Sequence, residues 1–143
     1  MSYIDNSLVM SDAQAVTASA DSTNSIDTQS ALRNIGNGRP IELIIVVATT
    51  VAASGGASNT TFSLQDSADN SSFATVVQGP AIAKATLVQG YVALRIMLPH
   101  GLRRYINVHY AVDTNNLTAG AFTAYLALDR QDNVAGTPGF TIP

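Results

Sequence analysis

The residues of this chain that are best suited to chemistry are few and lie far apart. Cysteine is absent, and the two histidines, His100 and His109, lack a second ligand at a recognised spacing such as the i, i+4 pair of a metal-binding helix. His100 lies in a Pro-His-Gly turn, and His109 lies in an alternating segment typical of a strand. We therefore expect structural roles for both histidines, and they predict no metal site.

Aspartates cluster at two places where a calcium site deserves consideration. Asp66 and Asp69 are close in sequence, and Asp113 precedes Asn115 and Asn116, so hard oxygen ligands gather at both places. Neither stretch follows the Asp-x-Asp/Asn-x-Asp/Asn-Gly order or ends in the closing Glu of a calcium loop. Because Asp and Asn side chains bind the backbone of their own turns, turn formation is the favoured interpretation of both clusters.

The remaining signatures of catalysis or cofactor binding are missing or incomplete. The Gly-x-Ser-x-Gly pattern of a nucleophile elbow does not occur. Gly36, Asn37 and Gly38 could be compared with a phosphate loop, but the third glycine, the following helix and the lysine are missing, so a plain turn is favoured. The sequence thus predicts no catalytic residue, no cofactor and no enzymatic activity.

Charge is scarce along the whole chain. Charged residues make up 12% of the 143 residues, and the net charge is -3. Such a surface has no basic field that would attract phosphates, so we expect no nucleic-acid partner. Residues 1–20 contain no Lys or Arg and no sustained apolar stretch, and the longest apolar run, 41–53, is too short to cross a bilayer. We expect a soluble domain that does not need disulfides and has no membrane partner.

The elements that must position these residues are strands. Glu and Lys, the usual surface helix formers, occur once each, whereas short apolar runs of period two alternate with Gly, Asn, Asp, Ser and Pro clusters. Strands are expected at residues 13–18, 25–28, 41–50, 61–65, 73–78, 81–88 and 91–98. Two further strands have clear inward-facing sets, which are Ile106, Val108, Tyr110 and Val112 in one and Phe122, Ala124, Leu126 and Leu128 in the other. We predict an all-β fold, a two-sheet antiparallel sandwich or jelly roll of about eight to nine strands.

The domain organisation follows from the same pattern. Residues 1–132 are predicted to form a single jelly-roll-like domain, in which residues 1–12 are an N-terminal arm. Residues 133–143 contain two Pro and two Gly together with Phe140 and Ile142, which is typical of an extended C-terminal tail with apolar anchors.

A set of aromatic and cationic residues on the outward alternation of the last strands suggests a partner-binding surface. Tyr and Arg are enriched in protein interfaces, although Tyr also suits any pleated surface. The residues we assign to this interface are Tyr91, Arg95, Tyr105 and Tyr125 on the strands and Tyr3, Ile4, Phe140 and Ile142 in the terminal arms.

Four ordered segments carry a family resemblance: SDAQAVTASADSTNSID (11–27), FSLQDSADNSSF (62–73), RYINVHY (104–110) and AGAFTAYLALD (119–129). Together they resemble the small capsid cement proteins of tailed bacteriophages, the group typified by the Bordetella phage cement protein. The resemblance implies a jelly roll on the outer capsid surface of the virion, made in the host bacterial cytoplasm. Its implied role is to bridge neighbouring major capsid proteins of the HK97-type fold, without catalysis or a cofactor.

The residues themselves leave other functions open. We expect self-association, as a homodimer rather than a trimer, in addition to the capsid contact. The alternative is a carbohydrate- or receptor-binding jelly roll of a phage fibre or appendage, although the chain has no Trp on which a sugar would stack. An enzyme of the cupin type is disfavoured, because its metal site needs several converging histidines.

Overall fold

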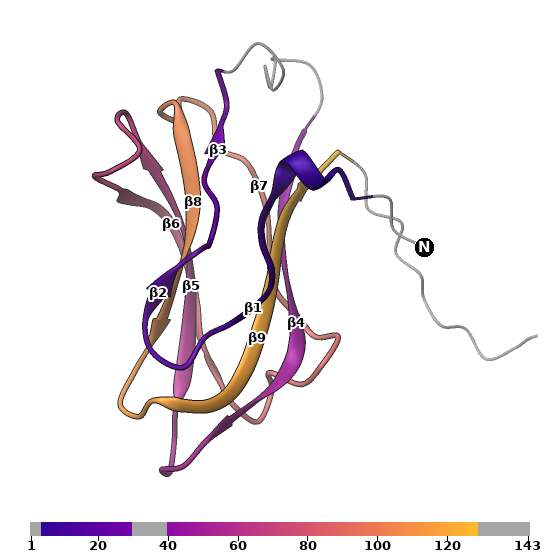
Figure 1. The fold of residues 1–143 in the computed structure, drawn as a ribbon, viewed down its shortest axis with the longest axis vertical. Coiled ribbons are helices and arrows are strands. Elements are labelled where there is room, and N and C mark those ends of the chain that lie inside the picture. Colours follow the sequence, from indigo (N-terminus) through magenta and orange to yellow (C-terminus); the bar gives the residue numbers. More distant parts are fainter. Residues whose placement is uncertain (1–3, 30–39, 129–143) are drawn as a thin grey trace, which may run out of the picture.

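The computed structural model of the chain describes residues 4–29 and 40–128, and these form two antiparallel sheets packed face to face (Figure 1). A short 3-10 helix, η1 (Asn6–Leu8), precedes the strands. One sheet has four strands in the order β1 (Val9–Ala15), β9 (Leu117–Ala127), β4 (Glu42–Ala53) and β7 (Val92–Met97). The other has five, with β2 (Ala20–Asp21) and β3 (Ile26–Asp27) both pairing with β8 (Tyr105–Val112), which is followed by β5 (Asn59–Ser67) and β6 (Ala74–Ala83).

This strand order is that of a jelly roll. Along the chain, strands of the four-stranded sheet alternate with strands or hairpins of the five-stranded sheet, so that β1 lies beside β9 and β4 lies between β9 and β7. The short strands β2 and β3 share one position of the roll, which gives nine strands in eight positions among the described residues. The all-β sandwich predicted from the sequence is confirmed.

The core between the sheets is centred on three aromatic rings. Phe62 of β5 meets Tyr110 of β8 and Phe122 of β9 edge to face, with ring centroids 5.9 and 5.1 Å apart, and the latter two rings stack at 5.3 Å. The Tyr110 hydroxyl donates a 2.8 Å hydrogen bond to Ser11 Oγ, so its polar end is satisfied inside the core. Burial raises the pKa of Tyr110 to about 12. These rings form one aromatic cluster that joins the two sheets.

The inward-facing sets predicted for the last two strands are largely correct. Ile106, Val108 and Tyr110 are fully buried, and the inner positions of β9 are buried as well. Leu128 is the exception, because it lies just past the end of β9 and 58% of its surface is exposed. The strand ladder that would hold it inward ends at Ala127.

Several strand boundaries differ from the prediction, and two of the differences have local reasons. Gly79 and Pro80 were expected to separate two strands, yet β6 continues through them, because both residues lie opposite Phe62 in a bulge of the β5–β6 ladder. At the N-terminus, β1 begins at Val9, and Met10 is fully buried in the core, so residues 9–12 belong to the sandwich rather than to an arm. The predicted tail, residues 133–143, lies outside the described residues.

At one edge of the roll, two short strands, β2 and β3, take the place of one longer strand. A clamp made by the Gln14 side chain links this edge to β1. Gln14 donates from Nε2 to the carbonyl of Asp21 and accepts from the backbone N–H of Thr23, each at 2.8 Å. Its Oε1 also accepts a hydrogen bond from Ser11 Oγ at 2.7 Å. Gln14 thereby ties the edge strand of the four-stranded sheet to the edge of the other sheet.

Candidate interaction surface

The outer face of the four-stranded sheet is apolar, in addition to its inner face. Val9, Tyr125, Ile44 and Arg95 are direct neighbours in register and form one row across all four strands. Ile44 and Tyr125 are buried, yet neither belongs to the core cluster between the sheets. We call the outward residues of this sheet the apolar face; its apolar members include Val9, Ile44, Val46, Val92, Met97, Tyr125 and Ala127.

The margin of the apolar face carries an ion pair and a strongly exposed side chain. Arg95 of β7 donates to Glu42 of β4 from Nε at 2.9 Å and from Nη2 at 3.2 Å. Exposed pairs of this kind contribute at most about 1 kcal/mol to stability, so the pair mainly balances charge. Met97 lies opposite Glu42 in the ladder, and 62% of its surface is exposed.

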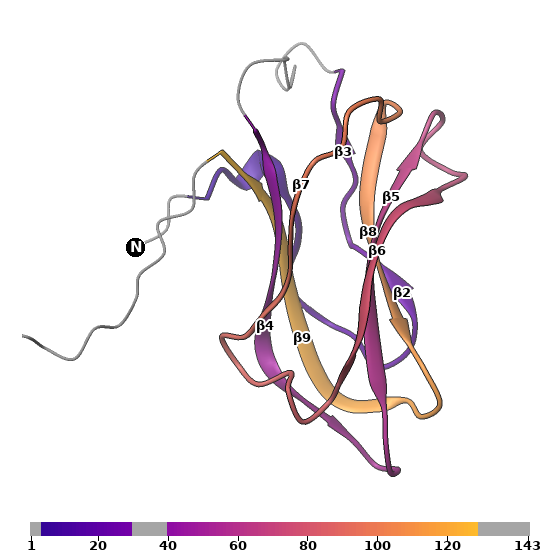
Figure 2. The same ribbon diagram turned by 180° about the vertical axis from the view of Figure 1, so that it is seen from behind.

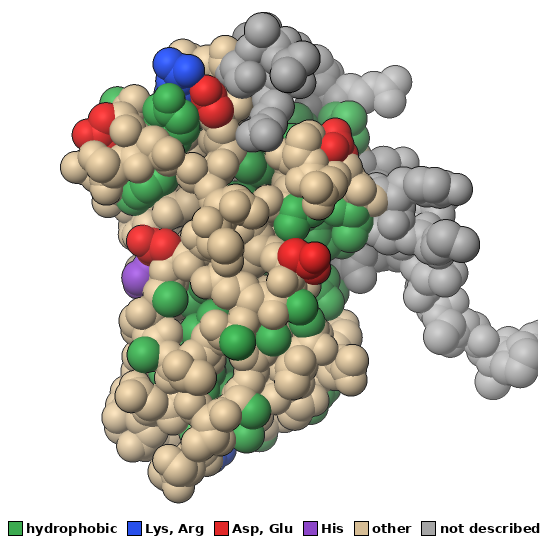
Figure 3. All heavy atoms as spheres, viewed as in Figure 1, with side chains coloured by type: hydrophobic (Ala, Val, Ile, Leu, Met, Phe, Trp, Pro, Cys, Tyr) green, Lys and Arg blue, Asp and Glu red, His purple; other side chains and the backbone are tan. Residues whose placement is uncertain are grey.

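The outer face of the five-stranded sheet is polar. We call it the polar face; its members alternate with the core residues of β5 and β8 and are Thr61, Ser63, Gln65, Ser67, Tyr105, Asn107, His109 and one apolar residue, Ala111. His109 Nδ1 lies 2.5 Å from the carboxylate of Asp21 on β2. Figure 3 shows the edge between the two faces, where charged side chains are isolated spots on an otherwise uncharged surface. The two sheets therefore present chemically different surfaces to opposite sides.

One end of the polar face carries a cation on an aromatic ring. The guanidinium carbon of Arg104 lies 5.0 Å from the centroid of the Tyr105 ring, a distance at which a cation–π contact forms. Asp27 on β3 accepts from Arg104 Nε and Nη2 at 3.0 and 2.8 Å, and this carboxylate raises the pKa of Arg104. Arg104 thus covers one side of the half-buried Tyr105 ring.

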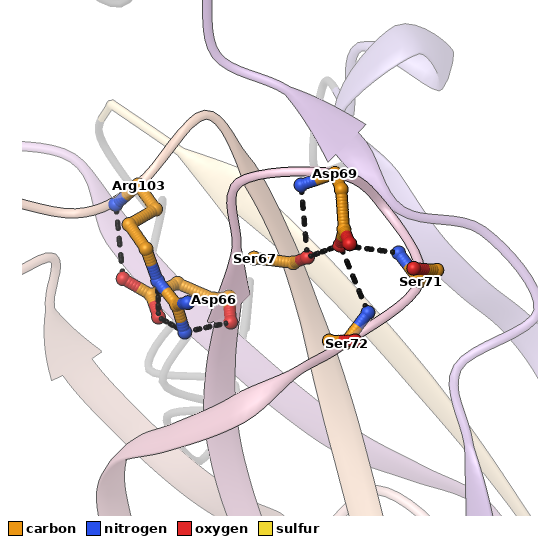
Figure 4. Close-up of polar contacts among 6 residues, drawn as sticks. All are labelled: Asp66, Ser67, Asp69, Ser71, Ser72 and Arg103. Carbon is orange, nitrogen blue, oxygen red and sulfur yellow. Dashed lines mark hydrogen bonds and ion pairs between the residues drawn. The ribbon is translucent and has the colours of Figure 1, made fainter.

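The aspartates considered for calcium are satisfied by protein groups (Figure 4). Asp66 accepts from the backbone N–H and the guanidinium of Arg103 at 2.6–2.9 Å, and the side-chain hydrogen bond from Arg103 lowers the pKa of Asp66. Asp69 accepts from the backbone N–H groups of Ser71 and Ser72 and from the Ser67 hydroxyl, and these bonds lower its pKa.

Asp113 likewise accepts from the backbone N–H of Asn59 at 2.7 Å, and that bond lowers the pKa of Asp113. Within residues 4–29 and 40–128, no three His, Cys, Asp or Glu side chains are grouped so that they could hold a metal ion. Turn and loop N–H groups thus engage Asp69 and Asp113, as expected, whereas Asp66 lies in β5 and pairs with Arg103.

The interface residues chosen from the sequence do not form one surface. Tyr91 precedes β7 and is exposed, and Arg95 lies on the apolar face, whereas Tyr105 lies on the polar face of the other sheet. Ile4 is exposed in front of η1, which packs against β9. Tyr3, Phe140 and Ile142 lie outside the described residues.

The assignment of Tyr125 to an exposed position is wrong. Tyr125 does point outward from β9, but only 5% of its surface is exposed, since Ile44 and Val9 flank it on the neighbouring strands. Sequence reasoning also missed Met97 and Ile44. The signal for Ile44 was present in residues 43–48, which are apolar on both alternations and therefore predict a strand covered on both sides.

Comparison with protein families gives a match that spans most of the sandwich. The Bbp16 family matches residues 10–126, which run from β1 to the end of β9. The chain belongs to the Bbp16 family. This family is named after a Bordetella phage protein, so the resemblance seen in the sequence to a Bordetella phage group is confirmed. No curated protein matches the chain. Of the helices in the described part, none is both long and apolar enough to span a membrane.

Proposed function

We propose that this Bbp16-family protein is a capsid cement protein. In this proposal it binds the outer surface of a phage head and bridges neighbouring major capsid proteins of the HK97-type fold. The observation that carries the proposal is the pair of opposed outer faces, one apolar and one polar, on a rigid jelly roll of a phage protein family. A bridge needs two separate contact surfaces on one stiff body, and the two faces meet that need.

Weak contacts are sufficient for such a bridge. Once one face is bound, the second contact forms at a high effective concentration, so two modest affinities combine into a strong attachment. Each contact can then bury about 800 Å² per partner or less and still hold, because many copies act in parallel over a shell. The rigidity of the core, centred on Phe62, Tyr110 and Phe122, lets the body transmit force between its two contacts.

The proposed activity is adhesion without catalysis. Asp66 is engaged with Arg103, Asp27 with Arg104, and Asp69 with N–H groups of its turn. A surface with few charges suits contacts between proteins better than contacts with nucleic acid. Self-association and capsid binding are accordingly the two partner contacts that we propose.

The direct test is a pair of particle reconstructions by electron cryomicroscopy, one from particles assembled with this chain and one from particles assembled without it. We expect additional density of sandwich shape on the outer surface, placed across the boundary between capsid subunits. Density at a tail fibre, or binding to a glycan array without binding to shells, would reject the cement function in favour of the receptor-binding alternative.

Residues 133–143 provide a second test, because they contain the proposed anchors Phe140 and Ile142. Deletion of this segment should leave the unfolding temperature within about 2 °C of the full chain, since a change of 0.5 kcal/mol or less is expected away from a core. The same deletion should reduce the number of copies retained on shells after washing. Retention at full occupancy would show that the segment is not an anchor.

A further inference from the structure

β2 and β3 act as one edge strand of the five-stranded sheet, with two residues inserted between them. Asp21 of β2 pairs with His109 of β8, and Ile26 of β3 pairs with Ile106. The four residues between Asp21 and Ile26 therefore lie opposite the two residues between Ile106 and His109. We call residues 20–27 the edge strap. Its insertion distorts the edge as a bulge does.

Main-chain groups at the insertion are bound by other parts of the same chain. Ser22 N–H donates to the Val108 carbonyl of β8 at 2.7 Å. The Asp21 carbonyl and the Thr23 N–H alternate with it and are bound from the side away from β8 by the Gln14 side chain, each at 2.8 Å. An added strand would need this side of the edge strap, and Gln14 occupies it.

The next residue of the edge strap is bound as well. Asn24 donates from its N–H to the Met10 carbonyl of β1 at 2.9 Å, and its own carbonyl accepts from Ser22 Oγ at 2.9 Å. Another strand pairs with the unbound N–H and C=O groups along an edge. The contacts of the insertion use four such groups between Asp21 and Asn24.

The Gln14 amide offers the edge strap the same kinds of bond as an added strand would. Its Nε2 donates and its Oε1 accepts, and a residue in a ladder likewise donates one bond and accepts another. Ser11 Oγ donates a further 2.7 Å hydrogen bond to Oε1, and Ser11 is fully buried. The amide is thus held where the peptide groups of another strand would bind.

The other edges of the sandwich carry protection of a different kind. Figure 2 shows the opposite side, where β6 has two register shifts and Pro80, and β7 has six residues and carries Arg95. β1 has two register shifts against β9 and carries the exposed Asp12. Irregular pairing, proline, charge and short length hinder strand addition through the strand itself. At the edge strap, two bonds come from one side chain of another strand, so a single substitution can remove them.

We propose that Gln14 is an edge cap, whose amide prevents a second copy of this chain from adding a strand at the edge strap. Loss of the amide frees the Asp21 carbonyl and the Thr23 N–H. Each opened edge then presents an acceptor and a donor, so the opened edges of two copies complement each other about a two-fold axis. This role of Gln14 goes beyond the proposed capsid contact and does not depend on it.

The first experiment compares variants of the full-length chain by sedimentation velocity over a range of concentrations. Gln14→Ala should strengthen self-association roughly tenfold or more relative to the unmodified chain, because new main-chain bonds form between copies. Gln14→Glu keeps an acceptor for Thr23 N–H and adds a charge at the edge, so it should associate as the unmodified chain does. Gln89→Ala, the same substitution in the exposed β6–β7 connection, is the matched control. An alanine variant of Gln14 that associates no more than this control, or no more than Gln14→Glu, would overturn the edge cap.

Loss of stability is a separate cause of association, and Asp66→Asn controls for it. The bonds of Asp66 join β5 to Arg103, before the start of β8, and not to Gln14. This variant is weakened in folding while the edge strap keeps its contacts, so at temperatures below unfolding it should associate as the unmodified chain does. Association as strong as that of Gln14→Ala would show that weakened folding is the cause, and would reject the edge cap.

Hydrogen exchange at Thr23 identifies where the two copies meet. In dilute solution, the Thr23 N–H of Gln14→Ala should exchange roughly tenfold faster than in the unmodified chain, because its acceptor is lost. In concentrated solution the same N–H should regain protection, since a strand of the second copy binds it. In Gln14→Glu its exchange should not depend on concentration. Association of Gln14→Ala without renewed protection at Thr23 would place the contact elsewhere and reject the edge cap.

Discussion

The two outer faces of the sandwich have the same strand geometry and opposite means of stabilisation. On the apolar face, Ile44 and Tyr125 are covered by neighbours in register, so burial of apolar surface stabilises this side. On the polar face, the buried Ser67 donates a hydrogen bond from its hydroxyl to Asp69, so a polar contact within a turn satisfies this side chain. The alternation of a strand thus determines which residues face the core, whereas the contacts on its outer side differ between the two faces.

The largest expected difference in stability is between alanine variants of two tyrosines that point outward on opposite faces. Tyr125→Ala removes a ring that is 95% buried, and it should lower the free energy of unfolding by about 3 kcal/mol, as for other buried aromatic truncations. Tyr105→Ala removes a half-buried ring held by Arg104 and should cost about 1 kcal/mol or less. Urea denaturation of both variants measures the difference. Equal losses would show that the two faces are stabilised in the same way.

The inner half of the fold could be predicted from the sequence because one physical rule governs it. Ile106, Val108 and Tyr110 alternate with polar residues, and a half-buried strand must place such a set against the core. The break at Gly79 and Pro80 was misjudged, because turn chemistry and bulge chemistry use the same residues. Whether the chain turns there depends on the partner strand, which lies far away in the sequence.

Contacts between side chains on the outer faces of the sheets could be predicted less well from the sequence. Tyr125 and Thr123 occupy the same outward alternation of β9. This alternation does not indicate that Tyr125 is buried while Thr123 is half-buried. Its burial depends on Ile44 and Val9, which the register brings from segments more than 80 residues away. The ion pair of Arg95 with Glu42 has the same origin, since the pairing of β4 with β7 sets it. Outward contacts of this kind need the strand order, which period-two patterns do not contain.

A smaller effect on stability, which depends on pH, is expected for Asp66. Its carboxylate joins β5 to the segment before β8 at one end of the five-stranded sheet. Asp66→Asn weakens the bonds to Arg103 and should cost about 2 kcal/mol at neutral pH, within the range for hydrogen bonds to charged groups. Arg103 lowers the pKa of Asp66 in the folded chain, so the carboxylate stabilises the fold above the unfolded pKa near 4, and this contribution is lost as pH falls through the folded value.

The unmodified chain should therefore lose more stability between neutral pH and acid than the Asp66→Asn variant does. Thermal unfolding followed over that range measures the two slopes. Asp12→Asn is the matched control, because it makes the same substitution at an exposed position on β1 of the other sheet, away from Arg103. Parallel curves for the unmodified chain and the Asp66 variant would show that the pairing with Arg103 does not contribute to stability.

The smallest effect is expected where the two sheets are joined at their edge by Gln14. Gln14→Ala removes the acceptor of Ser11 Oγ and the bonds to Thr23 and Asp21, and should cost about 1 kcal/mol, the usual net value of a hydrogen-bonded side chain. Gln89→Ala, in the exposed β6–β7 connection, is the control and should change stability by less than about 0.5 kcal/mol. Hydrogen exchange should become faster at Thr23 and in β2, while β4 and β9 keep their protection, because the clamp holds an edge and not the core. Uniformly faster exchange in both sheets would mean that this edge controls opening of the whole sandwich.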